Sequence, residues 1–562
     1  MNWNFARLLA PNTSWLEKKQ TSIMSAASVI AVASLLSFAA GLLRERVLIA
    51  TFFDTPASRE ALAAFTLAFQ IPDTAFQIII LGALSATLVP LFTNAKERSQ
   101  AEAFRMGSIV LNVLLVLFLV VTVLVLIFAE PLTKLRTGGA ISAEQIKIAT
   151  NLTRLMMFAQ LFFAVSNFMT GILQSYQRFI IPAISPILYN LGIVAGAVLL
   201  TDRLGIYAPG VGVVMGAFAH MIVQIPLVRK LGLKYTFSFN LKFPGVKQFL
   251  RLAPPRVLAL SLSEVRNLAM GFFATSIGSL SFLVIRYGLL LMAIPIRFVG
   301  VPIGQASLPF LSKEAADTDI NHFRDLLVQS LNQVAFLALP ATVLILVLRI
   351  PFVRIIFGTA NFPWEMTLTV GRVVGILSVS IVLQAMVHVM IRAFYALKNT
   401  KVPLVITLID TALYFALSAG LVFGLQYGVL GIAIATTVTA FVEFGLFLLL
   451  LNRLVTGLLG RPLLWPQFKM VLASFLMAVF LYLPFRIFDE LVFNTSRAIE
   501  VVGLAVTTGT IGMLVYIYFA ALFEIKELYL FVKLANKFGN WRQLLSETDE
   551  VVVEAYHGAD DV

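Results

Sequence analysis

Two arginines lie within an apolar stretch of this 562-residue sequence at a spacing that suits phosphate binding. Arg286 and Arg297 are eleven residues apart, which is about 1100° around an α-helix, so they share nearly one face at ~16 Å along the axis. A guanidinium stays ionised and bonds phosphate oxygens bidentately. The spacing predicts two rungs of one phosphate path, provided that Pro295 does not bend the helix. Alternatively, a carboxylate such as Glu264, or backbone carbonyls, neutralises Arg297 and Arg266.

A second group of ionisable residues lies in apolar stretches further along the chain. His388 and Arg392 are four residues apart and share a helical face, while Asp410 and Glu443 fall in the next two apolar stretches. One interpretation is a structural ion cluster that holds three helices together. The other is a proton or monovalent-cation site around Asp410, with Glu443 and His388, that couples ion flow or membrane potential to transport.

The composition shows which elements must position these charges. Hydrophobic residues make up 59% of the chain and charged residues 13%, against roughly 45–50% and 25% in soluble domains, so the chain is a polytopic membrane protein. It has no cysteine, four scattered histidines and no Gly-Lys pair, which excludes disulfides, thiolate metal sites and a Walker A loop. No cofactor is expected. Basic loops on one side of a membrane explain the net charge of +13 better than nucleic-acid binding does.

Fourteen apolar stretches are long enough to cross a bilayer, which takes about 20 residues. They cover residues 24–50, 61–93, 106–129, 146–174, 180–200, 207–228, 246–277, 280–311, 325–350, 367–396, 402–424, 428–452, 467–488 and 498–523. An even number places both ends of the chain on one side, and the loops on that side carry about twice as many Lys and Arg residues as the others, which predicts cytoplasmic termini. Residues 1–22 are expected to form an interfacial segment, and residues 524–562 a cytoplasmic amphipathic and acidic tail.

The chain also contains an internal repeat. Residues 174–182 resemble residues 395–403, and residues 71–92 resemble residues 294–311. The matches occur in the same order, which favours two pseudo-symmetric six-helix lobes followed by two further spans, at residues 23–229, 230–452 and 453–523. Repeats with an even number of spans are parallel, and transporters built this way bind substrate between the two lobes.

Three motifs are specific to a known family. They are Gly171-x-Leu-Gln-Ser175-x-x-Arg178-Phe-x-x-Pro182-Ala-x-x-Pro186-x-x-x-Asn190, Pro295-x-x-x-x-Gly300-Val-x-x-Gly304-x-x-x-Leu308-Pro-x-Leu-Ser312 and Phe394-Tyr-Ala-x-x-x-Thr-Lys-x-Pro403. With Pro255-Arg256, they make the chain similar, over about residues 25–525, to the MurJ (MviN) family of lipid II flippases in the multidrug/oligosaccharidyl-lipid/polysaccharide (MOP) exporter superfamily.

The resemblance implies a V-shaped bundle of two lobes around a central cationic cavity, with the two C-terminal helices forming a groove for a polyprenyl tail. It implies that Arg44 and Arg256, which match the family motifs, line the cavity, and Arg286 and Arg297 are the further candidates. Arg44 could instead be an interfacial anchor that extends outward. The sequence lacks arginines of the family's cavity at four positions, Phe38, Phe76, Gln77 and Leu290, and has Asn399 where the family has an Asp.

The resemblance implies a transporter, not an enzyme. Its substrate would be lipid II, an undecaprenyl-pyrophosphate-linked disaccharide-pentapeptide used for peptidoglycan synthesis, moved from the inner to the outer leaflet of the bacterial cytoplasmic membrane by alternating access without ATP. A monomer in contact with membrane lipids is favoured. The departures leave open a flippase for another polyprenyl-pyrophosphate glycan, such as an O-antigen or exopolysaccharide unit. A drug antiporter, a polyprenyl glycosyltransferase and a non-transporting scaffold are further alternatives, although short outer loops and unpaired carboxylates disfavour an enzyme.

Overall fold

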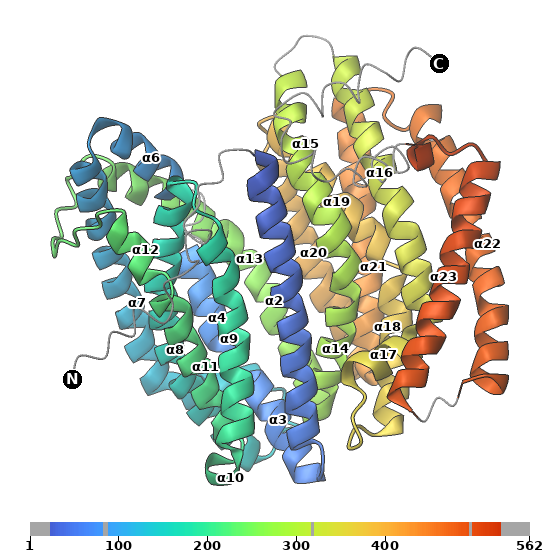
Figure 1. Cartoon of the computed structure of the whole chain (residues 1–562), viewed down its shortest axis with the longest axis horizontal. Helices are drawn as coiled ribbons and strands as arrows, with labels where there is room; N and C mark the ends of the chain where they lie inside the picture. The colour runs from blue at the N-terminus through green and yellow to red at the C-terminus, as the bar shows by residue number, and fades with distance from the viewer. Residues whose placement is uncertain (1–22, 82–87, 316–319, 494–496, 530–562) are drawn as a thin grey trace, which may run out of the picture. The chain divides into compact units, whose positions relative to one another are not determined.

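The computed structural model describes residues 23–81, 88–315, 320–493 and 497–529. The predicted segment 1–22 and most of the tail 524–562 lie outside the described residues. The described part is helical and contains no strand (Figure 1), which confirms the all-helical class. Within it, eleven helices are long and apolar enough to cross a membrane, and one bent pair would add a twelfth. The first and seventh predicted spans are the long helices α2 (Ile23–Phe52) and α13 (Val246–Ile277), which are not among these eleven.

The chain divides into two compact units inside α13, the first ending at Glu264 and the second beginning at Val265. Besides α2 and the start of α13, the first unit contains α3 (Pro56–Ala68), α4 (Gln70–Phe76), η2 (Gln77–Leu81), α6 (Leu88–Arg98), α7 (Gln100–Arg136), α8 (Ala143–Ser175), α9 (Ile180–Leu199), α10 (Thr201–Leu204), α11 (Tyr207–Ile222) and α12 (Ile225–Lys230). The second unit contains the rest of α13, then α14 (Ser279–Pro295), η3 (Ile296–Gly300), α15 (Val301–Glu314), α16 (Ile320–Val347), α17 (Arg349–Phe357), α18 (Trp364–Ser378), α19 (Ile381–Ala396), α20 (Lys401–Ala419), η4 (Gly420–Gly424), α21 (Gly428–Leu454), α22 (Arg461–Leu491) and α23 (Ala498–Leu522). The last residue of α7 and the turn after it, residues 136–141, belong to the second unit.

Glycines let α9 and α11 approach closely in the first unit. Gly192 and Gly196 of α9 face Gly212 and Gly216 of α11, and a Cβ atom added at any of the four would lie within 3.0 Å of backbone atoms of the facing helix. This is the small-xxx-small pattern that allows membrane helices to pack backbone to backbone. Because α9 also packs against α2, the glycine contact helps to set the position of the helix that faces Arg44.

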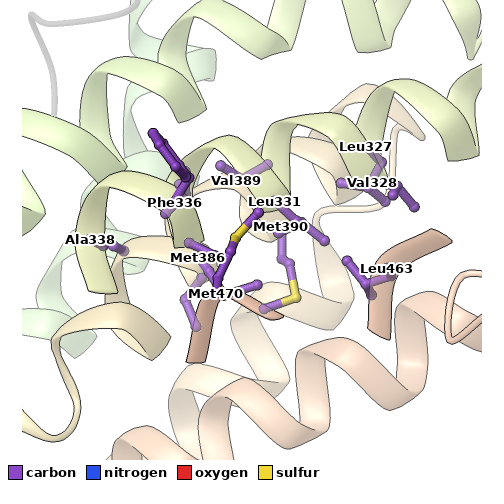
Figure 2. Close-up of a cluster of buried hydrophobic side chains, with 14 of the residues drawn as sticks. Leu327, Val328, Leu331, Phe336, Ala338, Met386, Val389, Met390, Leu463 and Met470 are labelled. Carbon is purple, nitrogen blue, oxygen red and sulfur yellow. The ribbon is translucent and has the colours of Figure 1, made fainter. Parts of the chain in front are cut away.

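The second unit has an apolar core where α16, α19 and α22 meet (Figure 2). Leu327 and Leu331 of α16, Met386 and Met390 of α19 and Met470 of α22 are buried in it. The helix α23 packs against α22 and α16. The last two helices therefore share the core of the second unit.

The segments that resemble each other in sequence also share local backbone geometry. Gln177 and Lys398 occupy matching positions after α8 and α19, and both have positive φ, 57° and 56°. In each turn the following residue donates its N–H to the carbonyl five residues earlier at 2.9 Å, the long bond of a Schellman-type helix end. The second pair of segments agrees as well, since each contains a π-helical turn, η2 or η3, beyond its first proline. The resembling segments therefore share these backbone turns as well as their sequence.

Candidate functional site

In the first unit, two polar partners hold Arg44 of α2. Its Nη1 donates to Oδ1 of Asn190 on α9 at 3.1 Å, and its Nη2 pairs with Glu45 at 2.6 Å. Asn190 is held in turn, because its Nδ2 donates to the carbonyl of Pro186 at 3.1 Å. The Arg44 side chain is 18% exposed. This arrangement differs from the freely extended side chain of an interfacial anchor.

A second carboxylate lies within electrostatic reach of Arg44. This is Asp73 of α4, which accepts a hydrogen bond from Nε2 of Gln160 on α8 at 3.0 Å. Two acidic groups near one guanidinium keep it charged and oriented.

The second-span positions at which the family carries charges are uncharged here. Phe76 packs against Phe163 with 5.9 Å between ring centroids, and Phe163 packs against Tyr189 at 4.9 Å and His220 at 5.2 Å. Gln77 is the first residue of the π-helical turn η2. An aromatic cluster that includes Tyr189 of α9 therefore occupies the positions at which the resemblance would suggest further charged side chains near Arg44.

The structure places Arg286 and Arg297 in different environments. Arg286 on α14 is half-buried beside the buried Tyr287, whereas Arg297 is exposed and lies in the π-helical turn η3, directly after Pro295. The chain from Arg286 to Pro295 is α-helical, and the π-helical turn begins one residue before Arg297. Leu290 is half-buried one turn after Arg286. The fourth candidate, Arg256, lies in α13, and its side chain is outside the described residues.

In the second unit, one guanidinium joins three helices. Arg266 of α13 forms an ion pair through Nη1 with Oδ2 of Asp410 on α20. Its Nη2 donates to Oγ1 of Thr439 on α21 at 3.1 Å, and its guanidinium carbon lies 4.9 Å from the ring centroid of Tyr414. The Asp410 side chain is 4% exposed and that of Arg266 26%, so the pair is largely shielded from solvent.

The cation beside Asp410 is not the one that the sequence suggested. Arg392 lies over an aromatic ring of its own helix, α19, at 5.9 Å, and His388 is half-buried on the same helix. Glu443 of α21, in contrast, is within electrostatic reach of both Asp410 and Arg266. A carboxylate does pair with Arg266, but it is Asp410, 144 residues away, and not Glu264.

The face of α20 around this ion pair carries further polar atoms. Four of them are buried without a hydrogen bond of normal geometry in the described part of the chain: Oδ1 of Asp410, Oγ1 of Thr411, Oη of Tyr414 and Oγ of Ser418. Buried polar groups normally have a partner, which can be water. Among the described residues, no three His, Asp or Glu side chains gather as a metal site requires.

Spacing could have pointed to two of these partners. Tyr414 follows Asp410 by four residues, and Thr439 precedes Glu443 by four, so each shares a helical face with a carboxylate already singled out. Asn190 closes one of the family motifs and contacts Arg44. The pairing of α13 with α20 has no such local signal.

The fold is that of a class of membrane transporters. A solved structure of lipid II flippase MurJ in an inward closed conformation aligns with a TM-score of 0.70 and 23% identity, over 88% of this chain and 98% of that chain. An inward-facing multidrug resistance MATE family transporter of the MOP superfamily aligns with a TM-score of 0.59 and 18% identity, over 74% of this chain and 94% of that chain. These likenesses show that the chain has the fold of these polytopic membrane proteins.

The family model for lipid II flippase MurJ matches residues 49–503. The chain belongs to this family, whose members are transporters and not enzymes, and the resemblance seen in the motifs is confirmed. The probable lipid II flippase MurJ of Bdellovibrio bacteriovorus is 26% identical over 507 residues, covering 89% of this chain and 94% of that protein. The lipid II flippase MurJ of Burkholderia cenocepacia is 25% identical over 383 residues, covering 67% of this chain and 73% of that protein.

Proposed function

We propose that this chain moves lipid II from the inner to the outer leaflet of the bacterial cytoplasmic membrane by alternating access, without hydrolysing ATP. Membership of the MurJ family over residues 49–503 carries this proposal. We also propose fourteen spans, with lobes at 23–229 and 230–452, two further helices at 453–523, cytoplasmic termini and a monomeric state. The repeated backbone turns at Gln177 and Lys398 support the two-lobe part of this proposal.

Arg44 is proposed to bind the diphosphate of the substrate. A guanidinium has five N–H donors, so it can keep its bond to Asn190 while it turns a bidentate pair of donors toward a phosphate. The phosphate would displace the carboxylate of Glu45, which carries less charge. Glu45 would pair with Arg44 again once the substrate leaves, so the cation stays oriented throughout the cycle. Further cationic contacts along the path are proposed for Arg256, Arg286 and Arg297.

We also propose that Asp410, Glu443 and His388 couple a proton, a monovalent cation or the membrane potential to transport; no other cofactor is proposed. Arg266 already pairs with Asp410, so a free cation has to displace the guanidinium of Arg266 from this carboxylate. That competition gives the carboxylate two states, paired with Arg266 or bound to the ion. Neutralising it with Asp410→Asn should change the pH or sodium dependence of transport. If neither dependence changes, the charges are structural.

The function is tested by rescue of a bacterium depleted of its own lipid II flippase, together with an assay for lipid II in the outer leaflet. Arg44→Ala and Arg286→Ala are expected to abolish rescue at unchanged expression. Arg46→Ala, two residues along the same helix, is the matched control and should grow normally. Full growth with both Arg44 and Arg286 changed would remove the binding assignment. Failure of the unaltered chain to expose lipid II would refute the function itself.

A second substrate is favoured by one observation. The family's charged second-span positions are represented here by Phe76, packed on Phe163, and by Gln77. A binding path with fewer charges suits a differently substituted glycan on the same polyprenyl pyrophosphate, such as an O-antigen or exopolysaccharide unit. The outer-leaflet assay repeated with such a lipid distinguishes the two substrates.

A further inference from the structure

The connection between α12 and α13 has an alternating sequence. From residue 233 to residue 243 every odd position is apolar and every even position is polar: Leu233, Tyr235, Phe237, Phe239, Leu241 and Phe243 against Lys234, Thr236, Ser238, Asn240 and Lys242. A period of two places alternate side chains on opposite faces of an extended chain. The structure has no helix between Lys230 and Val246. Residues 233–240 contain no turn, so the pattern gives them one apolar and one polar face, and a turn follows in which the N–H of Phe243 donates to the carbonyl of Asn240 at 3.1 Å.

Polar side chains of α7 fix the backbone of this segment. The N–H of Thr236 donates to Oγ of Ser108 at 3.2 Å, and Nδ2 of Asn112 donates to the carbonyls of Thr236 and Ser238 at 3.3 and 3.0 Å. The hydroxyl of Tyr235 donates to Oδ1 of Asn112 at 2.5 Å. Ser108 and Asn112 are themselves buried. The segment therefore has a defined orientation on α7.

Four of the six apolar side chains of the segment are exposed, whereas Leu233 and Phe243 pack against the core of the first unit. Phe237 is 78% exposed, and Tyr235, Phe239 and Leu241 are each at least 44% exposed. The rings of Phe237 and Phe239 meet edge to face, with 5.1 Å between centroids. Four large apolar side chains that project from a fixed backbone form an interaction surface.

The helix α7 shows where this surface lies along the membrane normal. Its apolar run from Ile109 to Ala129 is about 31 Å long at 1.5 Å per residue, which matches the ~30 Å hydrocarbon core of a bilayer. Ser108 and Asn112, which hold the segment, are at the start of that run. The exposed side chains are therefore level with the headgroup region, where amphipathic aromatic side chains are enriched.

The charge of the surrounding chain indicates which lipids suit this surface. No Asp or Glu occurs between Asp202 and Glu264, whereas the connection and its flanks carry six basic residues, Arg229, Lys230, Lys234, Lys242, Lys247 and Arg251. The guanidinium of Arg105, at the start of α7, lies 5.4 Å from the ring centroid of Phe243. Clustered Lys and Arg at a membrane surface attract anionic headgroups.

We propose that residues 233–243 form a lipid-binding segment. Its aromatic face enters the headgroup region of the membrane that holds the protein, and its lysines select anionic lipids there. The segment anchors the first unit at the membrane surface. This inference uses neither the proposed substrate nor the proposed arginines, so its failure would leave the proposed function untouched.

The sequence contains no cysteine, so a cysteine introduced at one position can be labelled there alone. Phe237→Cys, labelled with an environment-sensitive fluorophore in the full-length protein in nanodiscs, should emit at shorter wavelength and be quenched by lipids spin-labelled near the headgroup. The matched control is Asn240→Cys, on the polar face, whose probe should stay accessible to aqueous iodide. If the probe at position 237 is as accessible to iodide as the probe at position 240, the proposal is wrong. Phe239→Cys repeats the measurement should the first variant fold poorly.

Lipid selectivity is tested by comparing quenching by spin-labelled phosphatidylglycerol and phosphatidylcholine at position 237. We expect a preference for the anionic lipid of roughly fivefold for each lysine at the surface, since each contributes about 1 kcal/mol. The triple change Lys234→Gln, Lys242→Gln and Lys247→Gln should bring the ratio close to one while the probe stays inserted. Equal quenching by both lipids in the unaltered background would overturn the anionic preference. A probe that is shielded only in native membranes, and exposed in nanodiscs, would show that a protein partner covers the surface instead.

Discussion

Loss of the ion pair between Arg266 and Asp410 should destabilise the second unit. Asp410 is almost fully shielded, and its partner is about three-quarters shielded, so changing one residue leaves the other charge without its counter-ion. Breaking a buried pair in this way costs about 3–5 kcal/mol, whereas replacing both members is often nearly neutral. We expect Asp410→Asn and Arg266→Gln each to cost about 3 kcal/mol, at the lower end because Arg266 is partly exposed. The double variant should cost less than either single one.

The assay is thermal unfolding of the full-length protein in nanodiscs. At roughly 2–4 °C per kcal/mol for a unit of this size, each single variant should lower the midpoint by about 6–12 °C. Thr439→Val is the matched control, because it removes the hydrogen bonds of Oγ1 to Nη2 of Arg266 and to the carbonyl of Thr436 but no charge. A hydrogen bond to a charged group is worth about 1.5–3 kcal/mol. If the two single effects add up in the double variant, the residues are not energetically coupled and the reasoning fails.

The same variants distinguish a structural ion pair from a coupling site. If the pair only joins α13 to α20, the double variant should regain stability and transport together. If Asp410 binds a coupling ion or proton, stability should return without transport. The outer-leaflet assay for lipid II measures the second quantity.

Three further predictions concern packing and pH. Gly216→Leu should separate α9 from α11 and sharply reduce the yield of folded protein, whereas Gly445→Leu, whose added Cβ meets no atom within 4 Å, should be tolerated in the same expression test. Leu331→Ala, in the core of Figure 2, should cost about 2–5 kcal/mol, while the exposed Leu483→Ala should leave the unfolding midpoint nearly unchanged. Burial raises the pKa of Glu527, which lies beyond α23, so the folded state holds this proton more tightly and stability falls as pH rises from about 4.3 through the folded pKa. Glu527→Gln should remove this fall, measured as the midpoint against pH; an unchanged slope would contradict the assignment.

Several features of the candidate site could be predicted from local sequence. Asn190 is the last residue of one family motif and follows Pro186 by one helical turn. The structure shows that its side chain contacts Arg44 and the carbonyl of Pro186. The turns at Gln177 and Lys398, which share a positive φ, lie in segments that match in sequence. The π-helical turn at Ile296–Gly300 was not predictable from the eleven-residue spacing, because its change of register depends on how the helix packs.

The sequence alone determined the class of protein and its helices. The class of protein follows from the overall hydrophobic and charged content, which does not depend on how the chain folds. The spans follow from short stretches of sequence, because a helix in lipid must form its backbone hydrogen bonds within itself. The motifs likewise identify the family without reference to contacts. Only the tertiary structure decided that Arg266 pairs with Asp410, because two side chains 144 residues apart meet through the packing of whole helices. Such a contact depends on how the helices between the two residues pack, and that packing cannot be read from a short stretch of sequence.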